Sequence, residues 1–180
     1  LSSVALGLWL IDWQKWILAY PLFLVWMTFL FSGLFITAHD AFHQNLAPDH
    51  RWLNDAIGKF CLFIYGGFPF EPLKAKHRMH HAFPGTSKDP DYAAREQTGF
   101  IAWYSKFILT YTTWVQMGFF LASALLFTLV FKVSILAFAL TVGFPAILSS
   151  IQLFYFCTFQ THGADEKFHH TLNTRSLTLP

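Results

Sequence analysis

The 180-residue chain has little charge, and this scarcity is the first guide to its class. Asp, Glu, Lys and Arg make up 12% of the residues, against about 25% in an ordinary soluble domain. Hydrophobic residues make up 54% and aromatic residues 19%. The net charge is only +2, and no basic run with interleaved aromatics suggests a nucleic-acid partner. The composition therefore predicts a membrane protein.

Cysteine is scarce too, which argues against a disulfide-stapled fold. The two cysteines, Cys61 and Cys157, lie in apolar sequence and form no CxxC pair, so we expect buried, inert thiols. No cleavable signal peptide is visible. The chain opens at Leu1 inside apolar sequence. We expect a single domain over residues 1–180 that is truncated at both ends.

Three stretches without a charged residue are long enough to cross a bilayer, which takes ~20 apolar residues. They cover residues 16–38, 107–131 and 133–159. A shorter apolar piece, residues 56–70, contains Lys59, the Gly66-Gly67 pair and Pro69, and we expect it to be interfacial or re-entrant. The sequence thus predicts an all-α fold, an integral membrane helical bundle with a polar cap on one side.

All nine histidines fall on the same side of this topology, and five of them form two clusters. His39 and His43 are four residues apart, while His77, His80 and His81 follow the i, i+3, i+4 spacing of one helix face. Ten of the 12 lysines and arginines lie on that side, so the positive-inside rule predicts that it faces the cytoplasm. Because imidazole is a preferred ligand of Zn, Cu, Fe and Ni, we predict that these five histidines bind metal.

Other histidine-based functions fit this pattern less well. A zinc protease of the HExxH type needs a glutamate where this chain has Asp40, and one zinc takes only three or four ligands. Five histidines suit two metal ions better. A haem protein would pair histidines inside the bilayer, and a transporter would carry ionisable residues midway along its helices. Asp40 is a candidate hydrogen-bond partner of a ligand imidazole, with capping of the helix end as an equal alternative.

Several short segments around the two clusters carry a family resemblance. They are Leu34–His43, Lys76–His81, Pro84–Thr86, Asp89–Tyr92, Leu153–Phe159 and Asn173–Ser176. The histidine boxes resemble those of the membrane-bound di-iron oxygenases and desaturases. The strings between the boxes are similar to those of the β-carotene ketolases of bacteria and cyanobacteria. The resemblance covers most of the chain from about Phe29 onward.

The resemblance implies a chemistry and a site. Two iron ions held by histidines would activate O2, with electrons from a ferredoxin-type donor. Two successive hydroxylations at C4 of the β-ionone ring would give a gem-diol that loses water, which converts β-carotene through echinenone to canthaxanthin. The carotenoid would enter from the bilayer. The implied ligands are the five clustered histidines and His162, with no catalytic residue beyond the metal centre.

The chain also departs from the family pattern. The family has a further HxxHH box beyond the Asn173–Ser176 segment, and this sequence does not contain it; His169 and His170 follow a glutamate and are not counted as that box. We therefore expect that these residues alone do not complete a di-iron site. Two alternatives stay open: a fatty-acid desaturase or carotenoid hydroxylase of the same superfamily, and a non-catalytic membrane metal-binding or carrier protein.

Overall fold

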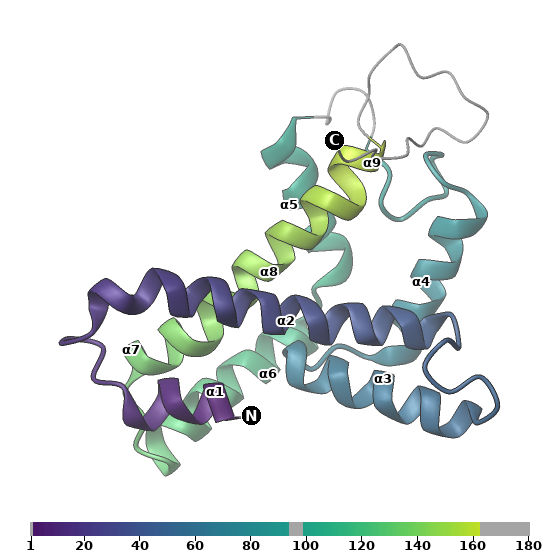
Figure 1. The fold of residues 1–180 in the computed structure, drawn as a ribbon. Helices are drawn as coiled ribbons and strands as arrows, with labels where there is room; N and C mark the ends of the chain where they lie inside the picture. Colours follow the sequence, from purple (N-terminus) through teal and green to yellow (C-terminus); the bar gives the residue numbers. More distant parts are fainter. Residues whose placement is uncertain (1, 94–98, 163–180) are drawn as a thin grey trace. The chain divides into compact units, whose positions relative to one another are not determined.

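The computed structural model describes residues 2–93 and 99–162 of the chain (Figure 1). All regular structure in these residues is helical, which confirms the all-α prediction. The longer helices are α2 (Tyr20–Phe42), α3 (Arg51–Gly66), α4 (Phe70–Ala82), α5 (Phe100–Tyr111), α6 (Trp114–Leu125) and α8 (Phe144–Phe154). The short helical turns are α1 (Ser2–Ala5), η1 (Leu6–Leu10), η2 (Ile17–Ala19), η4 (Leu126–Val130), α7 (Ile135–Phe138), η5 (Ala139–Gly143), η6 (Tyr155–Phe159) and α9 (Gln160–His162).

Two continuous helical stretches are long and apolar enough to cross a membrane, Ile17–Phe42 and Ile135–Phe159. Phe100–Tyr111 and Trp114–Val130 supply a third if the two together form one span. Between them Thr112 has an extended backbone, with φ −87° and ψ 130°. The uncharged stretch 107–131 therefore covers the end of α5, this break, α6 and η4. The described residues thus hold two or three candidate spans, consistent with an integral membrane protein.

The chain divides into two compact units. One comprises Leu1–Phe68 with Trp114–Ser150, and the other comprises Pro69–Thr113 with Ile151–Pro180, so the boundary falls within α8. Compact units of this kind can belong to one domain, and the expected single domain over residues 1–180 stays a prediction.

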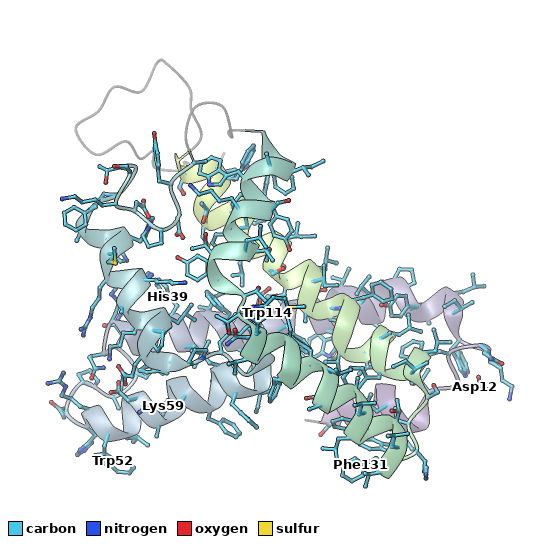
Figure 2. All side chains as sticks on the ribbon, turned by 180° about the vertical axis from the view of Figure 1, so that it is seen from behind. Asp12, His39, Trp52, Lys59, Trp114 and Phe131 are labelled. Atoms are coloured by element: carbon cyan, nitrogen blue, oxygen red, sulfur yellow. The ribbon has the colours of Figure 1, made fainter. Side chains whose placement is uncertain are left out.

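In the first unit, α2 and α3 lie side by side as an antiparallel pair (Figure 1). Pro21 stands in the first turn of α2, where its missing N–H leaves no helical hydrogen bond unmade. The rings of Phe31 and Phe35 pack against Tyr65 of α3, with centroids 6.1 and 5.4 Å apart. On the outer side Trp52, at the start of α3, is 73% exposed and points away from the helix (Figure 2). Such an apolar outer face suits contact with lipid.

A polar contact and a glycine turn fix the inner side of this unit. Buried Ser32 of α2 lies 3.1 Å from Ser149 of α8, hydroxyl to hydroxyl, and the Tyr65 hydroxyl lies 3.4 Å from Ser149. Hydrogen bonds of this kind join helices where no water is present. The turn after α3 is made by Gly67, whose φ of +70° and close approach to the Phe119 ring leave no room for a side chain. The helices of this unit are therefore held together by the hydroxyl contacts at Ser149 and by the close approach of Gly67 to Phe119.

The amino-terminal segment packs on the start of the last predicted span. A buried cluster forms there from Leu8, Trp13, Val133, Ala137, Phe138 and Leu140. The Trp13 indole N–H donates to the Gly7 carbonyl at 2.9 Å. Ser134 caps α7, since its Oγ accepts the N–H of Ala137 at 3.0 Å.

The second unit is built on an aromatic core that supports the loop after α4. Trp103 and Phe154 are almost fully buried, with Phe100, Tyr104, Phe107 and Phe159 around them. The Trp103 indole N–H donates to the Asp91 carbonyl at 2.8 Å, and Lys106 Nζ donates to the Tyr92 carbonyl. These two bonds fasten the loop to α5, and the same loop contacts a histidine of α4.

Candidate metal centre

The first histidine pair lies at the carboxyl end of α2. The rings of His39 and His43 are adjacent, with centroids 4.8 Å apart and planes inclined by 60°. Burial lowers the pKa of His43, and neighbouring His39 lowers it further. The lowered pKa favours the neutral imidazole, which is the form that binds metal.

A buried asparagine holds the segment that carries this pair. Asn54 of α3 is fully buried and donates from Nδ2 to the Ala41 carbonyl at 2.8 Å. Its Oδ1 accepts the N–H of Leu46 at 3.2 Å. Gln44, whose φ is +61°, turns the chain between these two positions and donates to Asp55 at 2.8 Å. The end of α2 is thus fixed to α3 on both sides of the turn.

The second pair lies on α4, one helical turn apart. His77 Nε2 and His81 Nε2 are 3.0 Å apart, with ring centroids at 4.5 Å. The two nitrogens are close enough that both could bind one metal ion, and imidazole nitrogen is a donor that iron accepts.

His80 differs from its neighbours because an acidic loop faces one side of its ring. Its Nδ1 lies 3.0 Å from Asp89 Oδ1 and 3.5 Å from Asp91 Oδ2. A carboxylate can only accept, so Nδ1 carries the proton of this bond, and Nε2 is left as the nitrogen that can bind a metal. The hydrogen bond to Asp89 raises the pKa of His80.

The two carboxylates of this loop have opposite pKa shifts. Burial alone would raise the pKa of Asp89, but the hydrogen bond from His80 and the N–H groups of Asp91 and Gly85 hold it below its usual value. Burial raises the pKa of Asp91, although the Tyr111 hydroxyl donates to its Oδ1. Asp89 is thus the carboxylate that the loop keeps ionised beside the histidine.

Of the remaining residues that the sequence predicted, Asp40 makes a weaker contact, and two histidines lie outside the part of the chain that the structure describes. Asp40 Oδ1 lies 3.4 Å from Nδ1 of His39, and its side chain is 44% exposed, so it is a looser partner than Asp89 is for His80. His162 is the last residue of α9. His169 and His170 lie outside the described residues. The assignment of the six histidines as ligands stays a prediction.

Three residues beside His80 or in contact with its partners have no role in the sequence prediction. Asp89 and Asp91 stood in the Asp89–Tyr92 segment of the family resemblance without an assigned role, and Tyr111 had no distinguishing context. The available signal was the Pro84-Gly85 turn directly after the HxxHH cluster. A turn at that place reverses the chain, so carboxylates a few residues later can return to the last helical turn.

Comparison with known proteins places this chain in a family. The fatty acid desaturase family matches residues 13–178. A β-carotene ketolase from Paracoccus sp. (strain PC1) is 36% identical over 184 residues, which cover 96% of this chain and 70% of that protein. A β-carotene ketolase from Haematococcus lacustris is 34% identical over 146 residues, 76% of this chain and 42% of that protein. The Δ12 fatty-acid desaturase of Arabidopsis thaliana is 29% identical over 94 residues, 51% of this chain and 23% of that protein.

No solved structure matches the chain. The family match nevertheless spans nearly all of the sequence, and the chain is shorter than the relatives named above. Candidate helical membrane spans and paired histidines at helix ends agree with that match. The chain belongs to the fatty acid desaturase family, as a homologue of the β-carotene ketolases within it.

Proposed function

We propose that this protein is a carotenoid ketolase that introduces keto groups at C4 and C4' of β-carotene. The observation that carries the proposal is the extent of the ketolase match, 36% identity over 96% of the chain. The match to a fatty-acid desaturase covers only 51% of the chain. The wider match favours the ketolase over the desaturase alternative.

Six histidines are the proposed ligands of two iron ions: His39, His43, His77, His80, His81 and His162. Support comes from the adjacent imidazoles on α2, the 3.0 Å nitrogen pair on α4 and the contact of His80 Nδ1 with Asp89. When bound, iron would supply the activation of O2 and the oxidation of a C–H bond. The chain's own contribution is to hold the imidazoles in adjacent pairs and, at His80, to engage Nδ1 with Asp89 so that Nε2 is the nitrogen that would bind the metal.

The surroundings fit a hydrocarbon substrate. Large side chains on the outer face of α2 are exposed, Leu22 to 79% and Phe29 to 67%, so this helix can lie in lipid beside a dissolved carotenoid. The bias of lysines and arginines toward the histidine side supports a cytoplasmic metal centre. A ferredoxin-type protein is the proposed electron donor, because it would reach that side from the cytoplasm.

A pigment chromatogram tests the proposal. The complete gene product is expressed, with oxygen, in cells that accumulate β-carotene, and the pigments are extracted and separated. We expect echinenone and canthaxanthin from the wild type, and only β-carotene from His39→Ala and His80→Ala. His50→Ala is the matched control, since His50 is an exposed histidine at the start of α3 that is not among the proposed ligands.

Each alternative has its own result in the same cells. Unchanged β-carotene, with iron-loaded protein present in the membrane, contradicts ketolation. A new double bond in the acyl lipids would then identify a desaturase, and hydroxylated β-carotene would identify a hydroxylase. Metal uptake without any O2-dependent product would identify a metal carrier.

A further inference from the structure

Asp89, which is outside the proposed ligand set, contacts a histidine in addition to the bonds that hold its own loop together. Asp89 accepts the N–H of Asp91 on Oδ1 and the N–H of Gly85 on Oδ2, both at 2.9 Å. These bonds alone would hold the loop. Its Oδ1 also lies 3.0 Å from Nδ1 of His80, on the preceding helix.

The loop holds Asp89 rigidly in this position. The Asp89 side chain is 1% exposed. Nearby Asp91 accepts hydrogen bonds from Trp103 and Tyr111 of α5. Gly85, with φ +68°, makes the turn that brings Asp89 back to the last turn of α4. The carboxylate is therefore fixed by protein contacts, and the ring of His80 has to adapt to it.

We propose that Asp89 is a positioning residue for the metal centre, acting through His80. Its carboxylate accepts the Nδ1 proton of His80, which fixes the orientation of the ring and directs Nε2 toward iron. This inference rests on the proposed function, since it takes His80 to be an iron ligand. Carboxylates in this position make a ligand imidazole a stronger donor, and their loss costs about 10–100-fold in metal affinity.

The other acidic residue beside a clustered histidine does not offer the same contact. Asp40 and His39 are consecutive on one helix, their atoms are 3.4 Å apart, and both side chains are well exposed. Water can replace that contact, whereas it cannot reach the buried side of Asp89. The structure therefore assigns the positioning role to Asp89 and not to Asp40.

The test is a double-mutant cycle on iron affinity. The complete protein is purified in detergent, loaded with Fe(II) without oxygen and titrated with a chromogenic chelator as competitor. We expect Asp89→Asn to weaken iron binding by about 10–100-fold. In the His80→Ala background the same change should alter the affinity by less than about twofold, because the residue acts through His80.

Thr86→Ala is the matched loop control. Its hydroxyl donates to the Phe83 carbonyl at 2.8 Å, within the same loop but without contact to His80. We expect this variant to bind iron as the wild type does. An equal loss in Thr86→Ala, or an undiminished loss from Asp89→Asn in the His80→Ala background, would mean that Asp89 serves only the loop and would overturn the proposal. So would wild-type affinity in Asp89→Asn.

A measurement on the wild type covers the case in which Asp89→Asn does not fold. The iron-free protein is labelled with 15N-histidine, and the resonance of His80 is identified by its absence in His80→Ala. At alkaline pH we expect the proton on Nδ1; a proton on Nε2 would overturn the proposal. Failure of the proposed function looks different, because wild-type protein that binds no iron in the titration would refute the metal centre itself, and the role of Asp89 with it.

Discussion

Replacing Asn54 by alanine should loosen the end of α2 that carries the first histidine pair. The Ala41 carbonyl would lose its 2.8 Å bond but keep the N–H of Gln44, which also points to it. The N–H of Leu46 would lose the acceptor that Asn54 provides. An unsatisfied buried group costs about 1–3 kcal/mol, and the space left by a fully buried side chain adds to this. We therefore expect a loss of about 2–3 kcal/mol in the free energy of unfolding.

The assay is equilibrium unfolding of the detergent-solubilised protein in SDS, followed by circular dichroism. Asn45→Ala is the control, since Asn45 is an exposed amide in the same turn and should cost no more than about 0.5 kcal/mol. The Asn54 variant should also release iron faster than the control, because His39 and His43 stand within the last turn that Asn54 holds. Equal stability of the two variants would refute the reasoning.

Three further substitutions test other parts of the fold by the same unfolding assay. Gly67→Ala should destabilise the protein by more than about 1 kcal/mol, because a left-handed backbone costs about 1–2 kcal/mol for a residue with a Cβ. The added Cβ would also lie 2.5 Å from the Phe119 ring. Gly118→Ala is the control and should be neutral or stabilising, since its added Cβ would meet nothing within 4 Å. Ser149→Ala should lower the free energy of unfolding by about 0.6–1.7 kcal/mol, since it removes the hydroxyl that the Ser32 and Tyr65 hydroxyls both contact. Ser134→Ala should cost about 1 kcal/mol by leaving the N–H of Ala137 uncapped, while Ser134→Asp should keep the cap and the stability.

The sequence was sufficient to predict the fold class and the local grouping of histidines. Low charge and long apolar stretches predicted helical spans, because backbone groups in lipid must bond within their own helix. The four-residue spacing predicted that His39 and His43 share a face, and their rings are adjacent. The same spacing predicted the proximity of His77 and His81. These features depend only on helical periodicity.

Features that depend on loop geometry were not predictable in this way. The approach of Asp89 to His80 is set by the left-handed turn at Gly85 and by bonds from α5, none of which has a periodic signal. The break at Thr112 interrupts an apolar stretch that contains no proline there, so hydropathy gave no sign of it. The approach of Asp89 arises from contacts between segments that the sequence pattern treats separately.

The length of the first candidate span has a consequence for the metal centre. Its 26 residues, Ile17–Phe42, measure about 39 Å at 1.5 Å per residue, against ~30 Å of hydrocarbon. When the helix stands upright with its first residue at one edge of the hydrocarbon, about 9 Å of it, roughly the last six residues, lies beyond the opposite edge. That portion holds His39 and ends next to His43. Membrane thickness would therefore determine how well these imidazoles are hydrated. A thicker bilayer would place the first histidine pair closer to the hydrocarbon core.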